Sequence, residues 1–330
     1  MQAANHSMIR KIHLVAAVLV FALLGMAAAS TWGWWGASEI EQDSAFVVPS
    51  GSSVSSVAEK LESEGLIASS DSFLLWAKVL GDSDPIKAGE FLLPAGASPS
   101  EILDTFQHGD VIRRFVTIPE GLPSIMVRER LMAEPLLTGP VPMPPEGSVL
   151  PESYDFERGE TRAAVLARMQ KAMRDTVAEL WPKRAPGIAV STPEQAVTLA
   201  SIVEKETGVA RERRMVAGLY SNRVKQGMLL QADPTIIYPI TRGKPLGRRI
   251  RQSEISAING YNTYTMVGLP RGPITNPGRA SIEAVLNPAR TAALYMVADG
   301  TGGHAFASSL DQHNANVAKW FALRRARGEM

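Results

Sequence analysis

Apolar residues recur along this chain at two spacings, and the two periods together predict a mixed α+β fold. Apolar positions three or four residues apart predict helices at 54–61, 73–80, 98–107, 125–131, 162–180, 193–206 and 211–226. Short apolar runs bounded by turn residues predict strands at 45–48, 87–93 and 115–118, and a buried strand at 293–298. We therefore expect a small β-α-α-β unit at 44–110 and a larger α+β domain at 111–330.

An uncharged apolar run from Leu14 to Ala29 dominates the N-terminal part. Two basic residues precede it, and three tryptophans and then acidic residues follow it. This distribution is typical of one membrane-spanning helix with its N-terminus in the cytoplasm. We expect a cytoplasmic tail at 1–11, a transmembrane anchor at 12–35 and the rest of the chain outside the inner (cytoplasmic) membrane. The alternative is a cleaved signal peptide, because the alanines at 27–29 resemble a cleavage site.

Composition excludes several classes of function. A net charge of +1 over 330 residues offers no basic surface of the kind that nucleic acid requires, so we expect no nucleic-acid partner. The chain has no cysteine, which excludes disulfides, thiolate metal ligands and cysteine nucleophiles. Its five histidines lack the close spacing of metal ligands, so the sequence predicts neither a metal site nor another cofactor.

The predicted helix at 193–206 is apolar until its last turn, where it presents two carboxyl groups. Helical spacing places Glu206 on the apolar stripe that contains Leu199 and Ile202, whereas Glu204 lies on another face. A carboxyl group held against apolar surface loses hydration in its charged form, so its pKa rises. Glu206 is therefore a candidate general acid. Glu204 could support it electrostatically or could point to solvent.

The loops that follow this helix are rich in amides, hydroxyl groups and aromatic rings. Rings stack on sugar faces while amides and carboxylates bind hydroxyl groups, so such loops suit a carbohydrate groove. The candidate substrate-binding residues are Gln231, Asp233, Thr235, Tyr261, Asn262, Tyr264, Asn276 and His304. Structural roles are the alternative: Asp233 and Asn276 precede prolines as turn starters do, the tyrosines could be core residues, and His304 could be a loop donor.

Taken together and in order, these motifs resemble the YceG-like, or MltG-type, endolytic murein transglycosylases over essentially the whole chain. The most specific segments are Ser-Ile-Val-Glu-Lys-Glu at 201–206, Gln-Ala-Asp-Pro-Thr at 231–235, and the Tyr-Asn-Thr-Tyr and Gly-Leu-Pro motifs within 261–270. The resemblance implies that Glu206 is the catalytic acid of a catalytic domain at 111–330. Two positions depart from the family pattern, since Glu152 stands where aspartate is more frequent and Arg271 replaces a frequent proline.

The β-α-α-β order at 44–110 is similar to that of LysM modules, which bind glycan chains. Periodicity alone supports only a small α+β unit and identifies no ligand, so a spacer domain is the alternative.

The resemblance implies cleavage of the β-1,4 bond between N-acetylmuramic acid and N-acetylglucosamine without water. One carboxyl group can do this, because it protonates the leaving oxygen and then takes the proton of the muramyl C6 hydroxyl as that oxygen closes onto C1. The product carries a 1,6-anhydro end, and no metal, nucleotide or flavin is required. The implied partners are nascent glycan strands, whose elongation the enzyme would terminate, and membrane-bound peptidoglycan synthases.

Two other functions fit the same residues. A lysozyme-like hydrolase would use Asp233 as a second carboxylate beside Glu206. A wall-binding scaffold would hold glycan without cutting it. The position of Glu206 on an apolar stripe argues against the scaffold, because an idle carboxyl group there would cost stability.

Overall fold

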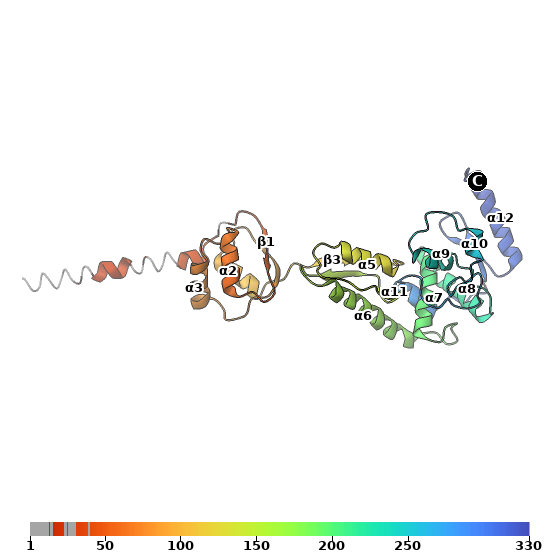
Figure 1. Ribbon diagram of the computed structural model, residues 1–330, viewed down its shortest axis with the longest axis horizontal. Helices are drawn as coiled ribbons and strands as arrows, with labels where there is room; N and C mark the ends of the chain where they lie inside the picture. The colour runs from red at the N-terminus through yellow and green to blue at the C-terminus, as the bar shows by residue number, and fades with distance from the viewer. Residues whose placement is uncertain (1–12, 14–15, 23–24, 26–30, 39, 330) are drawn as a thin grey trace, which may run out of the picture. The chain divides into compact units, whose positions relative to one another are not determined.

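The computed structural model describes residues 13, 16–22, 25, 31–38 and 40–329 (Figure 1). The chain divides into two compact units, one that ends at Arg114 and one that begins at Phe115, a few residues beyond the predicted domain boundary. The described residues form helices and three two-stranded sheets. The predicted α+β class is therefore confirmed.

The N-terminal unit has the predicted order of elements. Strand β1 (Ser44–Val48) pairs antiparallel with β2 (Gly89–Leu93), so that Phe46 lies opposite Phe91. The intervening helices are α2 (Val54–Ser63) and α3 (Ser70–Leu80), and α4 (Pro99–Gln107) follows. Phe106 of α4 packs its ring against both strand phenylalanines, with ring centroids 5.3 Å apart in each pair. The β-α-α-β arrangement is confirmed, and the likeness to a LysM module stays a prediction.

Of the 24 residues of the predicted anchor at 12–35, ten lie outside the described residues. Within the described part of the chain, no helix has both the length and the apolar character needed to cross a membrane. The described residues 16–22 are helical, and the apolar side chains of Val18, Leu19, Val20 and Phe21 are exposed.

The C-terminal unit begins with a sheet and two helices that share one hydrophobic cluster. Strands β3 (Arg114–Thr117) and β4 (Ser153–Phe156) pair with each other. In the view of Figure 1, β3 lies between α5 (Ser124–Ala133) and α6 (Arg162–Leu180). The cluster includes buried apolar residues of all four elements: Val116, Val127, Leu131, Phe156 and Met169.

Three helices form the second cluster of this unit: α7 (Pro193–Glu206), α8 (Arg213–Lys225) and α11 (Arg279–Leu286). The bounds of α7 are those predicted, because Thr192 caps its first turn and Pro193 follows the cap. Short helices fill the rest: Trp181–Lys183, Ala210–Glu212, α9 (Pro234–Thr241) and α10 (Gln252–Ile255). Glu206 is thus the last residue of a helix that packs against α8 and α11.

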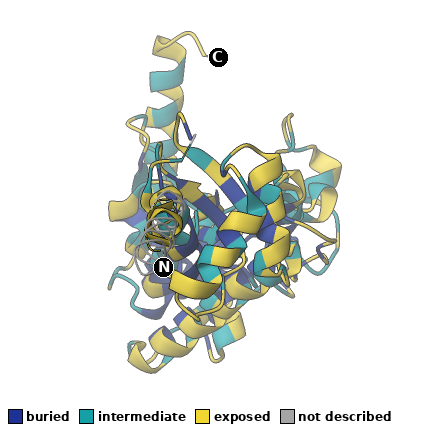
Figure 2. Cartoon of the chain, turned by 90° about the vertical axis from the view of Figure 1, so that its left-hand side faces the viewer, coloured by how far each residue is buried: buried dark blue, intermediate teal, exposed yellow. Residues whose placement is uncertain are grey.

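The chain ends in a hairpin of β5 (Tyr295–Ala298) and β6 (His304–Ala307), followed by helix α12 (Leu310–Ala326). The strand predicted at 293–298 is present, but its burial was predicted wrongly, since all four residues of β5 are only half-buried. The periodicity of the sequence predicts no helix at α12. Its apolar residues do not gather on one stripe, and the helix has no buried residue (Figure 2).

Candidate active site

The side chain of Glu206 lies at the wall of a pocket of about 360 Å³. Helix α7 supplies Glu206 at its last turn, α8 supplies Tyr220 and Arg223, and the loop that leads into α9 supplies Gln231 and Asp233. The pocket therefore joins three segments that are separate in the sequence. The other lining residues are Lys205, Leu219, Leu230, Pro234, Ile237, Tyr264 and Met296.

The carboxyl group of Glu206 is desolvated. Its Oε1 is buried without a hydrogen-bond partner within the described part of the protein. Burial and, second, the negative charge of Asp233 raise the pKa of Glu206 to about 7. A hydrogen bond from Tyr220 and the positive charge of Arg223 act in the opposite direction. The carboxyl group can therefore be protonated near neutral pH, as the apolar stripe of α7 led us to expect.

Glu204 makes a different contact. Its Oε2 accepts a hydrogen bond of 3.0 Å from the backbone N–H of Gly278, the residue that precedes α11. A carboxylate at this end of a helix also interacts favourably with the helix dipole. Glu204 thus links the end of α7 to the start of α11, and Asp233 rather than Glu204 supplies the like charge that acts on Glu206.

Arg223 is a buried cation that fixes the loop opposite Glu206. Only 7% of its surface is exposed. Its Nε donates to the carbonyl oxygen of Leu294 at 2.6 Å, and its Nη1 donates to that of Leu230 at 2.8 Å. The same Nη1 donates to Oε1 of Gln231 at 3.3 Å. The backbone of Gln231 is left-handed, with φ of 51°. This conformation costs energy in a residue other than glycine, and the hydrogen bonds from Arg223 to this loop help to maintain it.

A hydrogen bond between Tyr264 and Asp233 also holds the wall of this pocket in shape. The hydroxyl group of Tyr264 donates to Oδ1 of Asp233 at 2.6 Å. This bond fixes the carboxylate whose charge raises the pKa of Glu206. Four of the predicted site residues, Glu206, Gln231, Asp233 and Tyr264, therefore share one pocket.

Three other predicted residues are fully buried and make their hydrogen bonds within the protein. Thr235 bonds to the hydroxyl of Thr263 at 2.9 Å, and the amide of Asn262 donates to the carbonyl oxygen of Ala257 at 2.7 Å. The amide of Asn276 donates to the carbonyl oxygen of Leu122 at 2.9 Å. Contact between these side chains and a substrate stays a prediction.

The last two predicted residues lie elsewhere in the unit. The ring of Tyr261 packs against that of Tyr238, with centroids 4.7 Å apart, in a separate pocket of about 330 Å³. In β6, Nδ1 of His304 lies 2.9 Å from Oε2 of Glu212, and the backbone N–H of His304 donates to the other oxygen. A role for either residue in substrate binding stays a prediction.

Sequence reasoning missed Tyr220 and Arg223. Both continue an apolar stripe of α8 at helical spacing, together with Val216 and Leu219. A cation on such a stripe is the same kind of signal that identified Glu206. The sequence does not single it out, because the basic residues of this segment are also typical of an ordinary solvated face.

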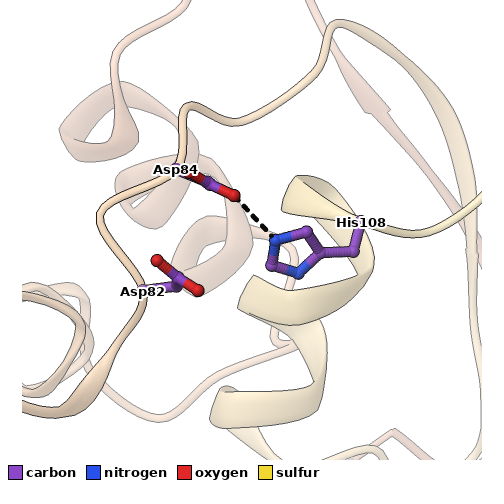
Figure 3. Close-up of side chains that lie close together, drawn as sticks. All are labelled: Asp82, Asp84 and His108. Atoms are coloured by element: carbon purple, nitrogen blue, oxygen red, sulfur yellow. Dashed lines mark hydrogen bonds and ion pairs between the residues drawn. The ribbon is translucent and has the colours of Figure 1, made fainter.

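One group in the N-terminal unit has the composition of a metal site: Asp82, Asp84 and His108 (Figure 3). Nε2 of His108 lies 3.1 Å from Oδ2 of Asp84, and its Nδ1 lies 2.7 Å from Oδ1 of Asp104. These hydrogen bonds raise the pKa of His108. Through His108 the group links the end of α4 to the segment 82–84.

A single desolvated carboxyl group at the wall of an open, polar pocket is the arrangement of an enzyme that uses general-acid catalysis. The model of the YceG-like family matches residues 46–319, and the chain belongs to this family. The resemblance predicted from the motifs is thus confirmed.

Characterised relatives cover most of this chain. An endolytic murein transglycosylase of Bacillus subtilis (strain 168) is 26% identical over 321 residues, which are 86% of this chain and 88% of the relative. An endolytic murein transglycosylase of Streptococcus pneumoniae is 28% identical over 82% of this chain but only 57% of its own length, so this chain spans little more than half of that relative. A crystal structure of a YceG-like protein from Listeria monocytogenes, 26% identical, aligns with a TM-score of 0.49 over 83% of this chain and 99% of that chain.

Proposed function

We propose that this protein is an endolytic lytic transglycosylase of peptidoglycan. It cleaves the β-1,4 bond between N-acetylmuramic acid and N-acetylglucosamine and leaves 1,6-anhydro ends. The observation that carries the proposal is the desolvated carboxyl group of Glu206 at the wall of an open pocket. The names of the bacterial relatives agree with it.

The reaction needs one group that first gives and then takes a proton. Glu206 donates its proton to the glycosidic oxygen as the bond from that oxygen to C1 breaks, and an oxocarbenium-like state develops. The resulting carboxylate then removes the proton of the C6 hydroxyl while the C6 oxygen bonds to C1. Glu206 ends protonated as it began, so the cycle consumes neither water nor a cofactor.

The neighbours of Glu206 keep its pKa close to the pH at which both steps run. The charge of Asp233 favours the protonated form that starts the reaction. The hydrogen bond from Tyr220 and the charge of Arg223 stabilise the carboxylate that forms in the middle of the reaction. A group whose pKa lies near the working pH serves well as both acid and base.

We assign the remaining predicted residues to two roles, according to where they lie in the unit. Gln231, Asp233 and Tyr264 offer polar groups to the sugar from the wall of the Glu206 pocket. The buried Thr235 and Asn276 hold the surrounding loops in shape.

Hydrolysis is the second candidate, and one observation favours it. Asp233 lines the same pocket as Glu206 and influences its pKa, as a second carboxylate of a hydrolase would. A hydrolase adds water to C1, whereas a transglycosylase closes the C6 oxygen onto it.

Mass spectrometry of products made in ¹⁸O-labelled water separates the candidates. The proposal predicts soluble fragments with unlabelled anhydro ends. Fragments that are heavier by one water and carry ¹⁸O would identify a hydrolase. Retention of the protein on insoluble wall without any soluble product would identify a binding scaffold.

We propose that the reaction takes place at the inner membrane. The apolar run from Leu14 to Ala29 with its flanking charges supports an inner-membrane anchor, with the catalytic unit outside the cytoplasm. A tether raises the effective concentration of the enzyme near strands that grow at the membrane, which suits termination of strand elongation. Membrane-bound peptidoglycan synthases are the partners that share this location.

The N-terminal unit is proposed to hold glycan, as its likeness to LysM modules suggests. A pocket of about 330 Å³ in this unit is lined by three aromatic residues, Trp34, Phe73 and Trp76, and by Ser38, Ser69 and Ser72. Aromatic rings beside hydroxyl groups suit the alternating apolar and polar faces of a sugar.

A further inference from the structure

The second pocket of the C-terminal unit carries positive charge that the protein does not neutralise. This pocket, of about 330 Å³, contains the packed rings of Tyr238 and Tyr261 and the side chains of Arg242 and Arg271. The guanidinium carbon of Arg271 lies 4.6 Å from the centre of the Tyr261 ring. Within the described part of the chain, neither guanidinium group forms a hydrogen bond or an ion pair.

The carboxyl group of Glu146, which lines this pocket, already accepts hydrogen bonds from other residues of the protein. Oε1 of Glu146 accepts hydrogen bonds from the backbone N–H of Ser124 at 2.8 Å and from the amide of Asn276 at 3.4 Å. Burial raises the pKa of Glu146, and hydrogen bonds with Ser124 and Tyr238 act in the opposite direction. The two arginines are therefore free to bind an anion from outside.

The backbone at Arg242 is the third observation. Arg242 ends α9 with a left-handed backbone, φ 57° and ψ 37°, a position that glycine usually fills. The backbone N–H of Arg242 donates to the carbonyl oxygen of Tyr238 at 2.8 Å, but its guanidinium group gains no bond from the described residues that would offset the backbone energy, which is the pattern of a residue whose side chain serves a ligand.

Helix α9 connects this pocket to the proposed cleavage point. Pro234 and Ile237 line the Glu206 pocket, whereas Tyr238 and Arg242 line the second pocket. The helix has eight residues, so its length along the axis, about 12 Å at 1.5 Å per residue, is an upper limit to the separation of these lining residues along it. A substituent of a strand held at Glu206 can reach across this interval.

We propose that the pocket of Arg242 and Arg271 binds a carboxylate of the peptide stem carried by the glycan strand. Guanidinium groups bind carboxylates through paired hydrogen bonds, and the tyrosine pair offers an apolar wall to the peptide. The inference rests on the proposed function, because it assumes a peptide-bearing glycan. It adds that the enzyme recognises the peptide as well as the sugar chain.

Direct binding tests the site without turnover. Soluble stem peptide, freed from wall by an amidase, is titrated calorimetrically into the full chain in detergent. We expect Arg242→Gly and Arg271→Gln each to weaken binding about ten-fold, the loss expected for one charge-assisted hydrogen bond. Arg242→Gly should not lower the melting temperature, since glycine suits the left-handed backbone. The exposed Arg249→Gln is the matched control and should bind as the wild type does.

Turnover provides the second measurement. The ratio of kcat/KM for peptide-bearing strands to kcat/KM for amidase-stripped strands should fall about ten-fold in both pocket variants and stay constant in Arg249→Gln. An unchanged ratio, or no binding of stem peptide by the wild type, would overturn the inference. A larger loss on the stripped strands would also overturn it, because it would show that the pocket binds the lactyl carboxylate, which is free only after the amidase has removed the peptide. If the wild type cuts neither strand, the proposed function fails, whereas cutting without a change in ratio removes this inference alone.

Discussion

At Glu206, two effects raise the pKa and two lower it, and the balance lies near 7. Desolvation is the largest effect, and it depends on where α7 ends rather than on any single neighbour. The charge of Asp233 is the second effect and the one that a point substitution can remove cleanly. The pH dependence of activity therefore reports on this residue.

We expect the rate to fall as the pH rises through about 7, because the protonated form of Glu206 starts the reaction. Asp233→Asn removes a negative charge, so the pKa of Glu206 drops and the alkaline limb of the rate profile moves to lower pH. The substitution should still cost less activity than Glu206→Gln, since one carboxyl group suffices for the transglycosylase route. Rates measured across pH 4 to 9 give both results, with the exposed Asp110→Asn as control. An unmoved limb would remove Asp233 from the electrostatics of the site.

The raised pKa of Glu206 should also make the free energy of unfolding depend on pH, with stability falling as the pH rises. The folded protein holds the Glu206 proton up to about pH 7, whereas the unfolded chain releases it near 4.5. Between these values the folded state binds more protons, so its stability falls as the pH rises. The decline that Glu206 contributes is on the order of 3 kcal/mol and ends above pH 7. Denaturant unfolding of wild type and Glu206→Gln should therefore diverge over this window, and parallel curves would contradict the raised pKa.

Among the structural elements, α11 and its preceding loop depend on buried amide contacts. Asn276 accepts a hydrogen bond of 3.0 Å from the backbone N–H of Val149 and donates to the carbonyl oxygen of Leu122 and the hydroxyl of Ser124. One side chain thus joins segments more than a hundred residues apart in the sequence. Its loss leaves several buried polar groups without partners.

Asn276→Ala should lower the free energy of unfolding by about 1–3 kcal/mol or more, as expected when buried partners lose a hydrogen bond. Chemical denaturation measures the change. The exposed Asn314→Ala in α12 is the matched control and should change stability little. If Asn276→Ala reduced substrate affinity at full stability, its role would be substrate binding, as the sequence suggested, rather than bracing.

The elements that the sequence predicted are those with a strong local signal. Helix α7 has a cap, a proline at its first position and an apolar stripe, and its bounds were predicted to the residue. Helix α12 has a serine cap but no apolar stripe, so periodicity could not reveal it. Glu206 could be predicted because it is a carboxyl group on the apolar stripe of α7. The arginine pocket could not be found, because Arg242 and Arg271 meet only through the fold.

At the scale of the whole molecule, the predicted anchor at 12–35 overlaps the N-terminal unit in sequence, because Trp34 belongs to the core of this unit. Trp34 and Ile40 are buried in the core of this unit, and the ring of Trp34 lies 5.7 Å from that of Phe73. A chain that begins at Ser44 therefore loses part of its core, whereas one that begins at Thr31 keeps it.

We expect the chain that begins at Thr31 to be soluble and to cut purified glycan, because the Glu206 pocket is built from later residues. The chain that begins at Ser44 should unfold its N-terminal unit at lower denaturant concentration, since two buried side chains are missing. If the chain is anchored as we propose, the exported soluble form should fail to replace it in cells, because release from the membrane removes the high local concentration near growing strands. A native protein that starts near Ser30 without membrane association would contradict the anchor.

The most direct test of the central claim compares Glu206→Gln with the wild type on insoluble peptidoglycan. The amide keeps the shape of the side chain but cannot deliver a proton, so binding to the wall should persist while release of anhydro-ended fragments stops. Pull-down measures the binding, and mass spectrometry counts the ends. We predict less than about a tenth of the wild-type release for the variant. Release of anhydro ends above that level by a folded Glu206→Gln protein would contradict the assignment of Glu206 as the acid.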